Sequence, residues 1–85
     1  MRLYLIRCEE TDRVKIGISE DCGRRLKQHQ CGSPTRLHLE VTWPVPKDEA
    51  SRLEALMHRL CKHYHLHGEW YEPEAAGIVR RAMKV

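Results

Sequence analysis

The sequence predicts a small α+β domain in which a three-stranded antiparallel sheet is flanked by helices, in the order ββαβαα. Two alternating apolar runs come first and are separated by a short polar turn, which is typical of a β-hairpin. A third alternating run follows a basic helical segment, and two later segments have apolar residues at helical spacing. At 85 residues, the chain is expected to form one domain over 1–85.

The predicted hairpin pairs residues 2–8 with residues 13–18. Tyr4 alternates with apolar residues in the first run, and Lys15 does so in the second. Pairing of the two strands would therefore bring Tyr4 and Lys15 to one face of the sheet. Gly17 lies on the same side as Lys15, and its missing side chain allows a ligand or another backbone to approach closely.

A helix is predicted over about 20–31, with Ser19 as its N-cap and Gly32 as its left-handed stop. The third strand is predicted over 36–43, where apolar and polar residues alternate. One face of this strand is expected to carry all four of its large apolar side chains: Leu37, Leu39, Val41 and Trp43.

Two further helices are predicted over about 48–64 and 73–83. Asp48 is expected to cap the first, and Pro73 suits the first position of the second. Residues 63–68 are expected to form a polar loop before the short aromatic run Trp70–Tyr71.

The formal net charge is +3, and basic residues concentrate in 24–29 and 58–67. If the two segments flank one site, they would attract an anionic partner such as nucleic acid. Arg24, Lys27 and Lys62 are the candidate nucleic-acid contacts in these segments. Two solvated helix faces would give the same pattern of charge.

No apolar run approaches the roughly 18 residues of a membrane span, and the N-terminus lacks a secretory signal pattern. A cytoplasmic location without a membrane partner is therefore expected. The four cysteines show no C-x-x-C spacing, so the sequence contains neither a zinc ribbon nor a thioredoxin-like motif. Cys8 and Cys61 are interpreted as small buried apolar side chains.

Several side chains suit phosphate chemistry. Arg25 and His29 are four residues apart and share a helix face, which can turn toward Tyr4 and Lys15. A guanidinium matches phosphate oxygens and stabilises charge that grows in a transition state. The alternative is that Tyr4 packs in a core while Lys15 and Arg25 are ordinary surface residues.

Glu54 lies in the middle of a predicted helix, directly beside the apolar stripe, with His58 four residues later on the same face. A carboxylate and an imidazole at this spacing can hold a divalent cation or share a proton. The alternative is an exposed Glu–His pair. Glu69 is expected to orient the site or cap a helix, and Trp70 or Tyr71 to pack in a core or stack on a base.

These motifs together resemble the GIY-YIG nuclease superfamily, in particular its short branch whose second motif reads KIG. The matching runs cover about residues 3–72, and their order carries the resemblance. They are Leu3–Ile6 at the GIY motif, Val14–Gly17 at the YIG motif, Ser19–Arg25, Leu53–His58 and Gly68–Tyr71.

The resemblance implies an endonuclease that hydrolyses DNA phosphodiester bonds with one divalent ion, Mg²⁺ or Mn²⁺, held by Glu54. Tyr4 would position or deprotonate the attacking water, and Arg25 would steady the scissile phosphate. Lys15, His29 and His58 would assist. RNA as the substrate and a homodimer as the assembly are left open.

Lys15 stands where the standard family has a second tyrosine, and the chain has no asparagine to match the family's supporting one. A protonated lysine cannot act as a base, although it can bind phosphate or lower the pKa of a nearby phenol. The alternative function is therefore a catalytically inactive nucleic-acid-binding module on the same fold. A third hypothesis is a small regulatory factor that acts through a dimer surface.

Overall fold

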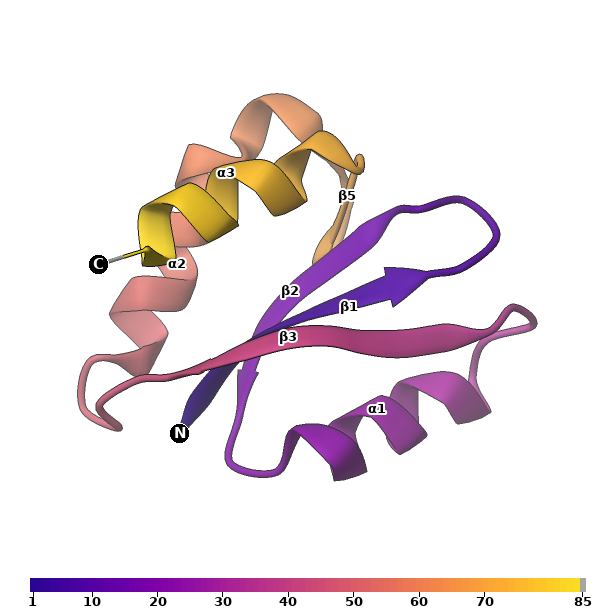
Figure 1. The fold of residues 1–85 in the computed structure, drawn as a ribbon, viewed down its shortest axis with the longest axis horizontal. Helices are drawn as coiled ribbons and strands as arrows, with labels where there is room; N and C mark the ends of the chain where they lie inside the picture. The colour runs from indigo at the N-terminus through magenta and orange to yellow at the C-terminus, as the bar shows by residue number, and fades with distance from the viewer. Residues whose placement is uncertain (85) are drawn as a thin grey trace.

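The computed structural model describes residues 1–84 and shows an α+β domain with a five-stranded antiparallel sheet and three α-helices (Figure 1). The strands follow the order β3-β1-β2-β5-β4 across the sheet. In chain order the elements are β1 (Arg2–Cys8), β2 (Val14–Ser19), α1 (Cys22–Cys31), β3 (Leu37–Pro44), α2 (Ala50–Leu60), the 3-10 helix η1 (Lys62–Tyr64), β4 (His65–His67), β5 (Trp70–Tyr71) and α3 (Glu74–Met83).

The prediction of a three-stranded sheet was wrong, because β4 and β5 add two strands beyond β2. These strands have three and two residues, which is too short for an alternating pattern to appear in the sequence. The 63–68 segment is therefore not simply a loop. It contains the end of η1 and one arm of a small hairpin that turns at Gly68, whose φ is 56°.

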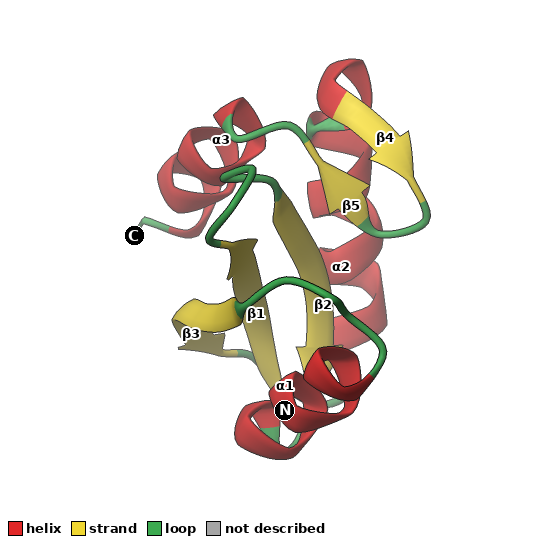
Figure 2. Cartoon of the chain, turned by 90° about the vertical axis from the view of Figure 1, so that its right-hand side faces the viewer, coloured by secondary structure: helices red, strands yellow, loops and turns green. Residues whose placement is uncertain are grey.

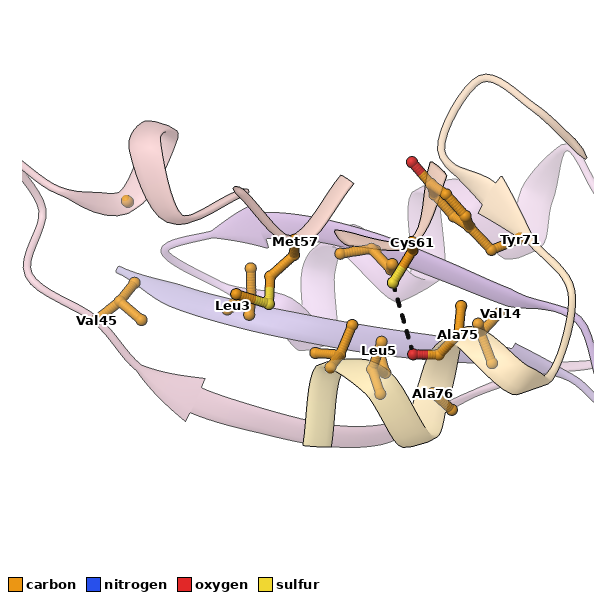
Figure 3. Packing of buried hydrophobic residues seen from close by; sticks show 12 residues of the cluster. Leu3, Leu5, Val14, Val45, Met57, Cys61, Tyr71, Ala75 and Ala76 are labelled. Carbon is orange, nitrogen blue, oxygen red and sulfur yellow. Dashed lines mark hydrogen bonds between the residues drawn. The ribbon is translucent and has the colours of Figure 1, made fainter. Parts of the chain in front are cut away.

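The sheet lies between two helical layers. Helix α1 covers one face, and α2 with α3 covers the other (Figures 1 and 2). The first core lies under α2 and α3 (Figure 3) and contains Leu3, Leu5, Val14, Ile16, Val45, Ala50, Met57, Cys61, Tyr71, Ala75, Ala76 and Val79. The second core lies under α1 and contains Tyr4, Ile6, Cys8, Cys22 and Leu37.

Alternation along β1 divides its side chains between the two cores, whereas the apolar side chains of β2 all face the first core. The thiols of Cys8 and Cys61 are buried as predicted. Cys61 Sγ lies 3.7 Å from the Ala75 carbonyl oxygen and joins α2 to α3 (Figure 3).

The face prediction for the third strand was wrong, because β3 contains a bulge. Leu5 pairs with Val41 but Ile6 pairs with Leu39, so Glu40 is the extra residue. The bulge changes the face of the strand half-way along. Leu37 and Leu39 therefore pack in the second core, whereas Val41 and Trp43 pack against the first.

The bulge also directs Glu40 toward two arginines on the α3 side of the sheet. Arg7 of β1 makes two side-chain hydrogen bonds to the Glu40 carboxylate, and Arg80 Nη2 of α3 donates a third over 2.7 Å. Together these donors lower the pKa of Glu40 to about 2, with the Arg7 hydrogen bond as the largest cause.

Several predicted helix ends are corrected by the structure. Asp21, not Ser19, caps α1, because its Oδ1 accepts from the Arg24 backbone N–H over 3.0 Å. Gly32 ends the same helix with φ −96°, so the stop is not left-handed. Asp48 does not cap α2, which begins after Glu49 and ends at Leu60.

Over residues 1–84, none of the helices combines the length and apolar content that crossing a bilayer requires.

Candidate functional site

Tyr4 lies opposite Gly17 in the β1–β2 pair, on the α1 face of the sheet. Its ring is 1% exposed, and its hydroxyl lies 3.5 Å from His29 Nε2 of α1. A Cβ on Gly17 would overlap this phenol, so the glycine leaves the space that the ring fills. The close approach predicted at Gly17 is therefore that of a protein side chain.

The phenol and the imidazole are both displaced from their ordinary titration ranges. Burial and the negative charge of Glu69 raise the pKa of Tyr4 well above 10, against a smaller opposing effect of Arg25. Burial, Lys15 and Arg25 lower the pKa of His29 below 6.5. At neutral pH the Tyr4 hydroxyl keeps its proton and His29 is neutral.

The edge of β2 is open beside this pair. β5 pairs with β2 at Val14 and Lys15, and the Ile16 N–H donates to the Glu69 carbonyl oxygen over 3.2 Å. From Gly17 onward, no strand pairs with β2 on that side. Side chains of α2 reach this edge. His58 Nε2 lies 3.1 Å from the Ile16 carbonyl oxygen, and the Ile18 backbone acts on the Glu54 carboxylate.

Both nitrogens of the His58 ring have partners. A carbonyl oxygen can only accept, so Nε2 carries a proton and donates to Ile16. Nδ1 is bonded to the Tyr71 hydroxyl, which comes from β5 and the first core. The ring therefore ties α2 to β2 and β5, and in this arrangement it has no free nitrogen for a cation.

Glu54, His58 and Glu69 form the carboxylate cluster, in which one ligand atom from each lies within 4.8 Å of the others. Glu54 Oε2 is 4.0 Å from His58 Nε2. Burial and the neighbouring Glu69 raise the pKa of Glu54, while His58 partly opposes the increase. Two carboxylates this close repel each other unless a proton or a cation lies between them, so the cluster is a possible metal site.

Lys15 shares its sheet face with Tyr4, as predicted, but it faces Glu69 across 3.7 Å. Its ammonium also lies 5.4 Å from the centre of the Trp70 ring. The side chain is 13% exposed, because these two neighbours cover it. Lys15 is therefore an internal partner of the cluster and not a solvated residue on a strand edge.

The basic residues of α1 are exposed and lie on the Tyr4 side. Arg25 is close enough to Tyr4 and His29 to lower the pKa of both groups. With Arg24 it lines a hollow of about 520 Å³ beside the end of β2. Lys27 is exposed on the same helix, whereas Lys62 lies in η1 and makes no ion pair with described residues of the cluster.

The predicted residues thus form two adjoining groups around one strand. Tyr4, His29 and Arg25 lie on the α1 face, while Glu54 and His58 come from α2 on the other face. They act on each other electrostatically, since both Glu69 and Glu54 raise the pKa of Tyr4. The open edge of β2 is where the two groups meet.

The sequence did not point to three contributors. The backbone of Ile16 and Ile18 takes part because the edge is open, and an exposed strand edge leaves no sequence signal when β5 itself is missed. Tyr71 packs in the first core, which is one of its two predicted roles, and its hydroxyl also orients His58. Only its place next to Trp70 in a Gly-Glu-Trp-Tyr run marks it.

Fold and site together define a small α+β domain in which carboxylates and basic groups meet at one open sheet edge. The chain belongs to the T5orf172 domain family, whose family model matches residues 1–85. This family is associated with nuclease-like and DNA-binding proteins. No curated protein and no solved structure matches the chain.

The assignment to the GIY-YIG nuclease superfamily was wrong, because the family model that matches the whole chain is that of the T5orf172 domain. The resemblance depended on runs of four to seven residues, and their order was its main support. Such short runs describe a hairpin followed by a basic helix, and they do not by themselves define a family.

Proposed function

We propose that the protein is a metal-dependent endonuclease that hydrolyses phosphodiester bonds in nucleic acid, with DNA as the expected substrate. The observation that supports this most is the meeting of a carboxylate pair with a phenol–imidazole pair at one strand edge. The family's association with nuclease-like and DNA-binding proteins agrees with it.

Glu54 and Glu69 would hold one divalent cation, Mg²⁺ or Mn²⁺. The residues fit such an ion, because carboxylate oxygens are its preferred ligands, and burial together with the neighbouring Glu69 raises the pKa of Glu54. When bound, the ion would neutralise charge on the phosphoryl oxygen and the leaving group. His58 would position the Glu54 carboxylate, and Lys15 would position that of Glu69.

His29 would accept the proton of the attacking water. It is neutral at pH 7, whereas deprotonation by Tyr4 would require a phenolate that its surroundings disfavour. The Tyr4 hydroxyl would position the water and relay its proton. It would accept a proton from the water as it gives its own to His29 Nε2 over the 3.5 Å that separate them, so that no phenolate forms.

Arg25 would bind the scissile phosphate from α1 and stabilise the charge that develops on it. Arg24 and Lys27 would hold neighbouring phosphates, since they are exposed on the same helix. Lys62, which follows the end of α2, would contact the nucleic-acid strand farther from the scissile phosphate.

A plasmid-nicking assay with Mg²⁺ or Mn²⁺ tests the proposal. Glu54→Gln and Arg25→Ala should each lower the rate of nicking by at least about a hundredfold. The matched controls are Glu49→Gln at the start of α2 and Arg52→Ala on its exposed side, which should nick at the wild-type rate. Full nicking by Glu54→Gln would remove the metal assignment.

The second candidate function is a nucleic-acid-binding module without turnover. The ion pair between Lys15 and Glu69 favours it, because Lys15 neutralises one carboxylate of the cluster without a metal. In that case binding of DNA would be unchanged by a chelator, and no divalent ion would produce nicking. Steep salt dependence is expected in both cases and does not separate them.

A further inference from the structure

A second hollow, of about 630 Å³, lies between α1 and the β4–β5 hairpin. We name it the side hollow. Its size is within the range of small-ligand sites in proteins. It adjoins the catalytic groups through two residues of its wall, since His29 contacts Tyr4 and Trp70 contacts Lys15.

The wall of the side hollow combines apolar and polar surfaces. Leu37, Leu66 and the Trp70 ring supply apolar area, and Trp70 is partly exposed. Gln28 and Arg13 also line it, and both are exposed. An aromatic ring with a few polar groups around it suits a flat heteroaromatic ligand that has hydrogen-bonding edges.

We propose that the side hollow binds one unstacked nucleobase of the strand whose phosphate lies at Arg25. The inference rests on the proposed function, because that phosphate fixes where the neighbouring base must be. The base would stack on Trp70, whose ring Lys15 already approaches. Gln28 and Arg13 would contact the edge of the base.

This placement defines the class of substrate. A base inside a continuous duplex is stacked and paired, so it must be extruded before it can enter a pocket. A base in a single strand, flap or bulge is already free to enter. The protein should therefore prefer nucleic acid that offers an unpaired base beside the phosphate that is cut.

Binding is measured with a strand of about ten nucleotides that carries one 2-aminopurine, either alone or in duplex, in a chelator so that no cutting occurs. The single strand is expected to bind about tenfold or more tightly than the duplex at equal salt. Trp70→Leu should weaken single-strand binding by about 5- to 100-fold and leave duplex binding within about twofold. Equal affinity for the two forms, or an unchanged Trp70→Leu, would overturn the proposal.

Trp43 provides the matched control, because it packs against the first core, away from the side hollow. Trp43→Leu should leave the preference for single strands unchanged. If Trp70→Leu does not fold, titration of the wild-type protein with deoxyadenosine monophosphate replaces it. The indole N–H resonance of Trp70 should shift while that of Trp43 stays in place, and the reverse pattern would refute the site.

The chelator keeps this test separate from the nuclease proposal. A protein that prefers single strands but never nicks DNA would refute the nuclease alone. A nuclease that binds both forms equally would refute the side hollow alone.

Discussion

Tyr4 and Gly17 face each other across β1 and β2, and the phenol occupies the space that any larger residue at position 17 would need. The pairing holds the hydroxyl beside His29. One residue without a side chain thus fixes the position of a group that the proposed chemistry requires, and it does so from inside the second core.

Gly17→Ala should destabilise the fold by about 1–3 kcal/mol, because the new methyl group overlaps a buried ring. Nicking should fall as well, since the Tyr4 hydroxyl must move. Gly77→Ala is the control, because its Cβ would meet nothing closer than Arg81 Nη1 at 3.7 Å within helix α3. Urea unfolding of both variants checks the difference, and equal stability of the two would contradict it.

Binding of Mn²⁺ should weaken on acidification from about pH 7.5 to about pH 5.5, since the cation competes with protons for Glu54. The pKa of Glu54 is raised, so the loss should begin at a higher pH than for an ordinary glutamate. Glu69→Gln should weaken Mn²⁺ binding at neutral pH. It should also move the acid-induced loss of binding to lower pH, because the charge of Glu69 no longer raises the pKa of Glu54. Calorimetric titration measures both, and a flat pH dependence in the wild type would argue against the cluster as the metal site.

The rate of nicking should fall on the acid side of a pH profile as His29 becomes protonated. Because the pKa of His29 lies below 6.5, this decrease should occur below pH 6.5. His29→Gln should lower the rate and remove the step. His63→Gln is the control, because His63 is exposed in η1 and packs against Tyr64, and it should leave the step unchanged. A step that survives in His29→Gln would assign the proton to another group.

Glu40→Gln should lower the free energy of unfolding at neutral pH by about 1–3 kcal/mol, because it weakens charged hydrogen bonds to Arg7 and Arg80. The folded pKa of Glu40, about 2, lies below its unfolded value of about 4.3. Its contribution is therefore present above about pH 4.3 and is lost as the pH falls toward 2.

Denaturant midpoints at several pH values test this contribution. The variant and the wild type should converge as the pH falls toward 2. The control is Glu9→Gln. Glu9 lies 3.6 Å from His38 with both side chains exposed, and such an exposed pair contributes little to stability. A constant difference between wild type and Glu40→Gln across the acid range would contradict the assignment.

Periodicity in the sequence was enough to predict the hairpin, the third strand and the helices α2 and α3, because each spans at least six residues with a regular apolar pattern. Helix α1 has no such pattern and was predicted from the polar residues before it and from Gly32 after it. It could not predict β4 and β5, whose pairing depends on a distant strand. It also could not show the bulge at Glu40, because a bulge leaves the alternation of residue types intact and changes only which side they face.

The sequence was enough to predict those site residues that share a face of the sheet or of a helix. Tyr4 and Lys15 follow from the hairpin, and Glu54 with His58 follows from helix spacing. The sequence could not show that both ring nitrogens of His58 have hydrogen-bond partners. One of these bonds depends on the Ile16 carbonyl oxygen being free of a neighbouring strand. Local sequence describes which side chains share a face, but not which backbone groups the sheet leaves unpaired.

The bulge in β3 has a thermodynamic consequence. β3 places Leu37 and Leu39 in one core and Val41 and Trp43 against the other. Unfolding of either core would therefore disrupt a strand that the other core also needs. The two halves of the domain should thus unfold as one cooperative unit. Trp43 and Trp70 lie against different cores and should report coincident transitions, whereas two separate midpoints would reveal independent subdomains.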